Sequence, residues 1–180
     1  MATDIIVATE RPNLMTSGLI TASSGTYDVA VPTATLPTTT SQTFMVPMAS
    51  GNTQSLMRLV PFHSANNATT PSFRVIGWSA YTQANSTPIY VPTLLADVAC
   101  SYNSTGGSIP SLSVDGTTQY FFHAVSVTGG APSVNSYSPG VAAAAGTPPA
   151  CILLDISGSQ YVTLQFESST GTMGAFYSFI

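Results

Sequence analysis

Apolar and polar residues alternate with a period of two along several short stretches of this sequence. The clearest stretch is 161–168, where Val162, Leu164 and Phe166 are expected to face a core and the residues between them to face outward. Clusters of Gly, Pro, Asn and Ser separate such stretches, and no window has a helical period. The pattern therefore predicts an all-β protein.

Further strands are expected wherever β-branched and aromatic residues are concentrated, at 54–62, 73–81, 92–102, 119–127, 151–156 and 175–180. Turn residues lie between them, at 103–107, 115–116, 129–130, 157–158 and 170–171, and Asp115-Gly116 is the best hairpin signal. Many short strands with no helix between them predict an antiparallel β-sandwich, jelly-roll-like in its arrangement.

Three strands carry details that bear on packing. In 54–62, Met57 and Leu59 share one face and Leu56, Arg58 and Val60 the other, so one partly apolar face is expected to meet a second layer or a partner. In 73–81, the central Gly77 suggests a bulge or the close approach of another backbone. In 92–102, alternation assigns one face to Leu94, Ala96, Val98 and Cys100.

The sequence divides into a weakly patterned region, 1–52, and a sandwich domain, 53–180. The first region reads as extended, with strands near 26–31 and 43–46, and it is either an arm lying on a neighbouring subunit or the first strands of the sandwich. A long segment rich in Gly, Pro, Ser and Ala, 128–149, is expected to project as a loop and touch a partner.

Charge is scarce in this chain. Only 6% of the 180 residues are charged, none of them lysine, and the net charge is −4, whereas about a quarter of an ordinary soluble protein is charged. Serine and threonine, roughly a quarter of the chain, replace the missing charges. The surface is therefore expected to be rich in hydroxyl groups or covered by other subunits. Plentiful aromatic residues argue against disorder, and three scattered arginines argue against nucleic-acid binding.

No membrane or secretion signal is expected from the sequence, because no apolar run is long enough and the N-terminus lacks a basic segment. The two cysteines, Cys100 and Cys151, lie in expected strands. They are interpreted first as small buried apolar residues, with a disulfide as the alternative that spacing does not decide.

Catalytic, metal-binding and cofactor-binding patterns are absent from the sequence. The two histidines, His63 and His123, have no nucleophile or acid at a characteristic spacing, and the carboxylates are scattered. The cysteines and histidines lack zinc-ligand spacing, and no phosphate-binding glycine loop follows a strand. We therefore expect no catalytic residue, no metal and no cofactor, with a hydrolase as a minor alternative. Aromatic side chains could instead stack on sugars, the candidates being Trp78, Tyr81, Tyr90, Tyr120 and Tyr161.

Several segments resemble a pattern in small virion proteins of tailed bacteriophages. The strand Phe73-Arg74-Val75-Ile76-Gly77-Trp78-Ser79 is followed by Tyr90-Val91-Pro92-Thr93-Leu94-Leu95, as in the "RV-hydrophobic-GW" and "aromatic-V/I-P-T" segments of those proteins. The likeness continues through 151–158, 160–166 and the apolar end 174–180, and covers about 56–180. The region before it and the segment 128–149 have no counterpart.

The resemblance implies a capsid decoration (cement) protein of a bacteriophage, a family with no active-site residues to carry over. Its members form trimers on the outside of the shell, so we expect a homotrimer that binds the major capsid protein, is made in the host cytoplasm and resides in the virion. The candidates for the subunit interface are apolar side chains, namely Met57, Leu59, Phe176, Tyr177, Phe179 and Ile180. A receptor- or glycan-binding module of a phage tail is the main alternative, and a major shell subunit is a further one.

Overall fold

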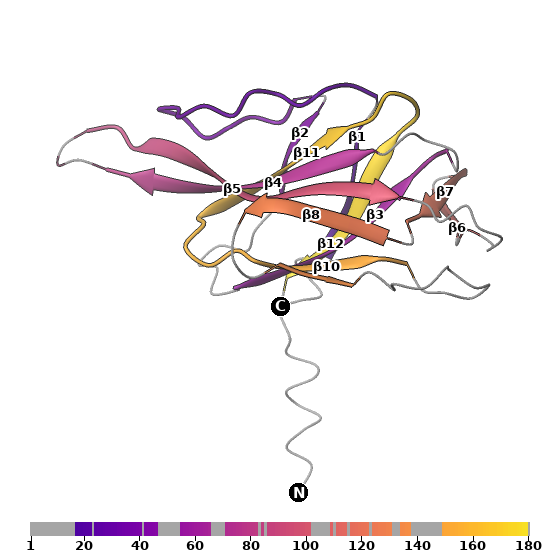
Figure 1. Cartoon of the computed structure of the whole chain (residues 1–180). Helices are drawn as coiled ribbons and strands as arrows, with labels where there is room; N and C mark the ends of the chain where they lie inside the picture. The colour runs from indigo at the N-terminus through magenta and orange to yellow at the C-terminus, as the bar shows by residue number, and fades with distance from the viewer. Residues whose placement is uncertain are drawn as a thin grey trace, which may run out of the picture.

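Two antiparallel sheets lie face to face in the computed structural model of the chain (Figure 1). The structure describes residues 17–22, 24–40, 42–46, 55–65, 71–82, 84, 86–101, 109, 111–114, 116–122, 124–130, 134–137 and 149–179. Within these residues every regular element is a strand. The prediction of an all-β antiparallel sandwich is confirmed, and its jelly-roll-like character stays a prediction.

The first sheet has seven strands, and five of them follow the order β1-β12-β3-β10-β9. These are β1 (Ser17–Ala22), β12 (Met173–Phe179), β3 (Leu56–His63), β10 (Cys151–Asp155) and β9 (Val134–Tyr137). The first half of β3 pairs with β10, and its last residues pair with β7 (Thr117–Phe121). β7 pairs in turn with β6 (Ser111–Val114).

The second sheet has five strands in the order β2-β11-β4-β5-β8. These are β2 (Thr43–Val46), β11 (Tyr161–Glu167), β4 (Ser72–Tyr81), β5 (Ile89–Ser101) and β8 (Ala124–Gly130). The β4–β5 hairpin extends beyond the other strands at one end of the sandwich (Figure 1).

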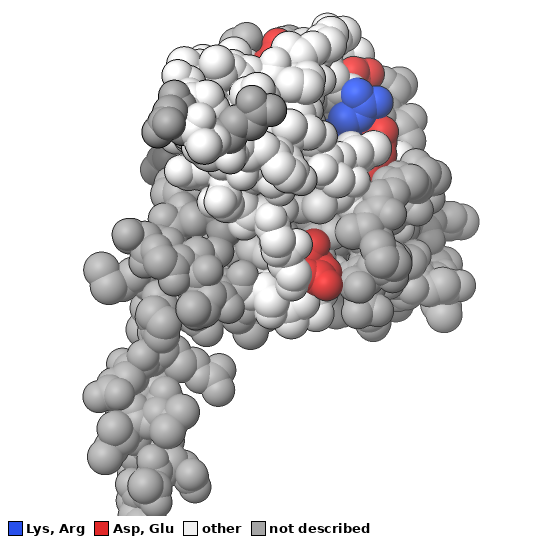
Figure 2. Space-filling view, turned by 90° about the vertical axis from the view of Figure 1, so that its left-hand side faces the viewer, with Lys and Arg blue, Asp and Glu red and all other residues white. Residues whose placement is uncertain are grey.

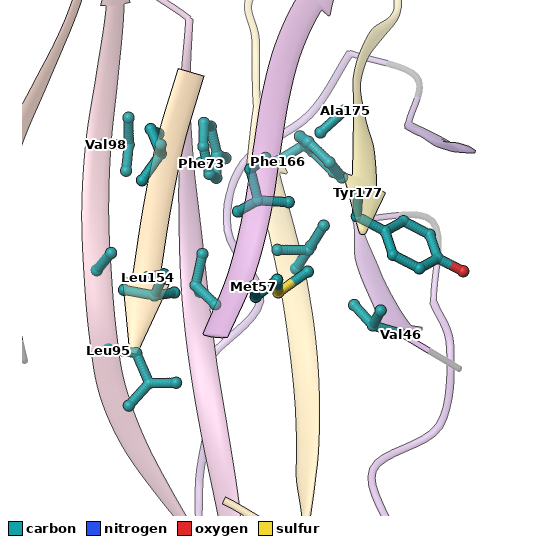
Figure 3. Packing of buried hydrophobic residues seen from close by; sticks show 14 of the residues in the cluster. Val46, Met57, Phe73, Leu95, Val98, Leu154, Phe166, Ala175 and Tyr177 are labelled. Carbon is teal, nitrogen blue, oxygen red and sulfur yellow. The ribbon is translucent and has the colours of Figure 1, made fainter. Parts of the chain in front are cut away.

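The core lies between the two sheets, where alternate residues of facing strands are fully buried (Figure 3). Val162, Leu164 and Phe166 of β11 point inward as their alternation predicts, and all three are buried. From the first sheet, Ile152 and Leu154 of β10 meet them in the same apolar cluster. Burial of apolar area on both inner faces is what holds the sandwich together.

Most expected strands are found within a few residues of their predicted bounds, including the strand at 43–46. The Asp115-Gly116 hairpin is confirmed, because Gly116 joins β6 to β7 with a φ of +76°. Gly158 and Gly171, at two other expected turns, also have positive φ. The expected turn at 103–107 lies outside the described residues.

The expected strand 119–127 is wrong, because two strands of different sheets occupy it. β7 ends at Phe121 in the first sheet and β8 begins at Ala124 in the second. Phe122, between them, is fully buried, and its carbonyl accepts a hydrogen bond from the amide of Ala150. The chain therefore crosses the core at an aromatic residue, which a run of uniformly β-prone residues conceals.

The segment 128–149 is not one long loop. Its first residues complete β8, so Gly129-Gly130 lies in a strand and not in a turn, and Val134–Tyr137 forms β9 on β10. Of the remaining residues only Pro149 is described. The expectation that this segment touches a partner is not tested by these strands.

The region 1–52 contributes β1 and β2, one strand to each sheet. The expected strand at 26–31 is wrong, because residues 24–40 run as irregular backbone over the second sheet (Figure 1). We call this segment the strap. Two backbone bridges connect it to the sandwich, one from Gly25 near its start and one from Thr33 near its middle. The described residues include no helix long and apolar enough to span a membrane.

Candidate binding surface

The strap is fixed to the sandwich at two backbone positions. Gly25 exchanges two hydrogen bonds with Ser168, of 3.0 and 3.1 Å, just beyond the end of β11. Thr33 exchanges two with Tyr90, of 3.0 and 2.7 Å, on the free edge of β5. Between Gly25 and Thr33 the chain crosses the outer face of the second sheet without pairing with a strand. Side-chain contacts therefore hold this part of the strap against the sheet.

Tyr27 is the first side chain that does so. Its hydroxyl bonds Ser72 Oγ at 2.7 Å, and the guanidinium of Arg74 lies 4.1 Å from the centre of its ring. Arg74 also pairs with Asp97 at 3.0 Å, the one salt bridge found among the described residues. Burial raises the pKa of Tyr27 well above its usual value, so the ring stays neutral and its hydroxyl stays a donor.

Asp28 is the second fixing point, and it organises a chain of hydroxyl and amide groups. The hydroxyls of Thr40 and Thr43 both donate to its carboxylate, and these two bonds hold the pKa of Asp28 below its usual range. Thr40 lies on the returning part of the strap and Thr43 begins β2. One carboxylate therefore ties both limbs of the strap to the edge of the sheet.

Gln165 of β11 ends this hydrogen-bonded chain. Its Nε2 donates to Thr43 Oγ1 at 3.0 Å. A hydroxyl has only one proton, and that of Thr43 is donated to Asp28, so Thr43 must accept from the amide. This fixes the orientation of the amide, and it leaves Gln165 Oε1 buried without a hydrogen-bond partner.

Trp78 of β4 also lies beneath the strap and is only 3% exposed. Its indole N–H donates to Thr163 Oγ1 at 2.9 Å, a bond between neighbouring strands on the outer face. Strap residues and Trp78 line the same hollow of about 230 Å³. The outward-facing Trp78 and Thr163 are therefore covered and are not in solvent.

A bulge in β5 shapes the rest of this face. The register between β4 and β5 shifts after Val75, so that Val75 lies opposite Ala96 and Ile76 opposite Leu94. The extra residue turns Leu94 to the outer face, and its assignment to the face of Ala96 is wrong. The expectation drawn from Gly77 is met only in part, because the bulge lies in the neighbouring strand β5 and the group that approaches Gly77 is a side chain and not a backbone. A Cβ at Gly77 would lie 2.2 Å from Ser159 Oγ.

The re-aimed Leu94 forms part of an open pocket of about 380 Å³ between the strap and the sheet. Apolar side chains form its floor, namely Ile76, Pro92 and Leu94. Tyr27 to Ala30 of the strap, with Arg74 and Gln165, complete the lining. The pocket thus has an apolar floor, and Gln165, one of the residues that line it, has a buried amide oxygen without a partner.

Exposed apolar side chains are concentrated on the strap and on β4 and β5. Val29 is 85% exposed and Val31 56%, both on the strap. Of the seven large apolar side chains exposed among the described residues, six belong to the strap or to β4 and β5: Val29, Val31, Leu36, Tyr81, Ile89 and Leu94. We call Val29, Val31, Leu36 and Leu94 the strap face, because Tyr81 and Ile89, which pair with each other near the end of the hairpin, alternate to the other side of the sheet. A concentration of this kind is typical of a surface that binds another molecule.

The residues assigned from the sequence as an interface lie on β3 and β12 of the other sheet. Met57, Leu59 and Phe179 are fully buried in the core, and Tyr177 is 8% exposed. Phe176 points to the opposite side of β12 and is half-buried against Phe62 and Phe121. Ile180 lies outside the described residues. The core side chains serve this chain's own folding, so they offer no surface to a second subunit in this fold.

The histidine that the structure describes is held in a structural role. The amide of Ala65 donates to Nδ1 of His63 at 2.9 Å, so Nε2 carries the proton and donates to Ser168 Oγ at 2.8 Å. The Ser168 hydroxyl donates in turn to the carbonyl of Thr170. The serine proton thus points away from the imidazole, which is the reverse of an activated nucleophile. His123 lies outside the described residues.

The other candidate groups are also accounted for. Cys100 is buried in the core and Cys151 is half-buried on β10, and both are free thiols. Burial raises the pKa of Cys100, whereas Cys151 Sγ accepts a hydrogen bond from Arg58 at 3.2 Å. Across the described ranges, no three metal-ligating side chains come together.

Of the aromatic residues proposed as sugar platforms, Trp78, Tyr90 and Tyr161 are neighbours on the second sheet, and the other two lie apart from them. Trp78 is buried, Tyr90 and Tyr161 meet edge to face at 5.8 Å, Tyr120 is half-buried on β7, and Tyr81 is exposed on β4. The five do not make one exposed platform, because Trp78 is covered and Tyr81 and Tyr120 lie elsewhere. Sequence reasoning missed the strap face, and the signal that bears on it is the Thr- and Pro-rich composition of 32–40 beside the apolar Val29 and Val31.

Comparisons with protein-family models, with curated proteins and with solved structures found no match to this chain.

Proposed function

We propose that this protein is a non-enzymatic structural component of a virion, a capsid decoration protein that binds the outer surface of the major capsid protein through its strap face. The observation that carries the proposal is the set of exposed apolar side chains on the strap, together with Leu94 of β5 beneath it. Such a surface is costly to leave in water and gains free energy when a partner covers it.

The scarcity of charge supports a binding role for this surface. With three basic and seven acidic residues in the chain, the described surface in Figure 2 is almost wholly uncharged, and the charged groups occupy a few small areas. A neutral interface contains few ion pairs that salt could screen, so its affinity should change little with ionic strength. That property suits a protein that must stay bound to a shell.

The identity of the partner is proposed from the resemblance of 73–79, 90–95, 151–158 and 160–166 to small virion proteins of tailed phages. Those segments form β4, β5, β10 and β11, which lie in both sheets. We propose a homotrimer, because several copies bound together raise the effective concentration of each contact with the shell.

The direct test is rebinding of the purified protein to capsids stripped of it. Val29→Asp places a carboxylate in the strap face, where binding would bury it without a partner, and should weaken rebinding at least about tenfold. Leu112→Asp is the matched control, because Leu112 is 52% exposed on β6, away from the strap face. It should rebind as the parent does.

Equal rebinding of the two variants would remove the strap face from the proposal. Failure of the parent protein to bind shells would remove the decoration role itself. Light scattering tests the trimer separately, and a stable monomer at micromolar concentration would contradict it.

A further inference from the structure

We propose that the 380 Å³ pocket beneath the strap is a socket for a single anchoring side chain of the protein partner, an apolar group that carries one neutral N–H donor. Such a group has the chemistry of an indole. This inference rests on the proposed function, since it names what the strap face would receive. The pocket's size, lining and one unpaired atom together carry it.

The size and floor of the pocket suit one bulky apolar group. A volume of 380 Å³ lies at the lower end of the range for pockets that bind small molecules. Ile76, Pro92 and Leu94 form the floor, and Leu94 faces it only because of the bulge in β5. Single aromatic side chains that fill pockets of this kind supply much of the binding energy of protein interfaces.

The polar requirement comes from Gln165. Its amide is fixed by Thr43, and Oε1 is left as a buried acceptor with no partner. An unmade bond of this kind costs about 1–3 kcal/mol, which a donor on the ligand would recover. The atom is enclosed, so the donor reaches it when the strap between Tyr27 and Thr33 yields slightly.

The charged groups around the pocket already have partners, which favours a neutral donor over a cation. Asp28 accepts hydrogen bonds from Thr40 and Thr43, and Arg74 is paired with Asp97. A second cation would also lie beside the guanidinium of Arg74. Among the side chains that line the pocket, the neutral amide oxygen of Gln165 is the buried acceptor that has no partner.

Indole and indene provide the test, because they share a shape and only indole has the N–H donor. The methyl resonances of Ile76 and Leu94 should shift on titration with either compound, and indole should bind about fivefold to tenfold more tightly. Val60 is an internal control, because it lines a separate hollow on the first sheet and should not shift. In Gln165→Met, which keeps the length but loses the acceptor, the two compounds should bind equally.

Three results would overturn the inference. The first is no shift of Ile76 or Leu94 at millimolar probe, and the second is equal affinity for indole and indene in the parent protein. The third is salt-sensitive binding of ethylguanidinium at these methyls with no response to indole, which would assign a cation instead. None of these readings needs a shell, so they are separate from failure of the decoration role.

The role as a partner's anchor has its own readout. Saturating indole should reduce rebinding of the parent protein to stripped shells, and indene at the same concentration should reduce it less. Undiminished rebinding with the pocket filled by indole would show that the shell does not use the pocket, and would overturn the anchor assignment.

Discussion

The two faces of the five-stranded sheet are held by different chemistry. On the inner face, Leu164 and Phe166 of β11 pack against the apolar side of the other sheet. On the outer face of the same strand, Thr163 and Gln165 are almost equally buried, but their contacts are hydrogen bonds to Trp78 and Thr43. One strand thus belongs to an apolar core and to a polar layer under the strap.

This difference separates stability from binding. The inner face buries side chains completely, and the gain grows with every apolar atom removed from water. The strap is held at separate points, each net hydrogen bond contributing only about 0.5–1.5 kcal/mol, and hollows remain between them. The strap can therefore adjust to a partner while the sandwich beneath it stays folded.

A matched pair of leucines gives the largest expected effect. Leu164→Ala empties part of the core and should lower the free energy of unfolding by about 2–5 kcal/mol. Leu94→Ala removes the same atoms from a side chain that is 42% exposed on the outer face, and should cost less than about 1 kcal/mol. Urea unfolding measures both values. Equal losses would mean that the two faces are not energetically distinct.

The core of this sheet could be predicted from the sequence, and its outer layer could not. Alternation correctly assigned Val162, Leu164 and Phe166 to the core, because a period of two follows directly from strand geometry. The same alternation assigned Thr163 and Gln165 outward, which holds, but it contains no information about what covers that side. Their burial depends on a strap more than a hundred residues away in the sequence.

The candidate site depends even more on such distant features. Leu94 reaches the pocket because one extra residue in β5 reverses its face, and a bulge of this kind leaves the composition of a strand unchanged. In β3 and β12 the sequence misled in another way, because Met57 and Phe179 were assigned to a subunit interface although they are buried in the core. Apolar residues predict burial without telling a core from an interface.

Thr163 offers a smaller effect that probes the polar layer alone. Thr163→Val keeps the shape but leaves the buried indole N–H of Trp78 without an acceptor, at a cost of about 1–3 kcal/mol in urea unfolding. Thr163→Ser restores the hydroxyl and should recover most of the loss. Trp78 is the only tryptophan in the chain, so its fluorescence reports directly on this layer. Identical stability of the Val and Ser variants would refute the role of the bond.

Acid should weaken the two regions in separate pH windows, with the smallest effects. Burial holds the pKa of His63 below its ordinary 6.5, so the unfolded chain takes up a proton first, and stability should fall as the pH drops below about 6.5. Asp28 behaves differently, because hydroxyl donors lower its pKa. Its contribution is present above its ordinary value of 3.8 and is lost as the pH falls through its lower folded value.

Two readouts separate these windows. Between pH 7 and 5, the urea midpoint should fall while the fluorescence of folded Trp78 stays constant, and His63→Gln should remove the part of the slope due to that residue. Below about pH 4, Trp78 fluorescence should change as Asp28 releases the strap, and Asp28→Asn should show the changed signal already at pH 7. A strap that loosened together with the first loss of stability would mean that the polar layer and the core unfold as one unit.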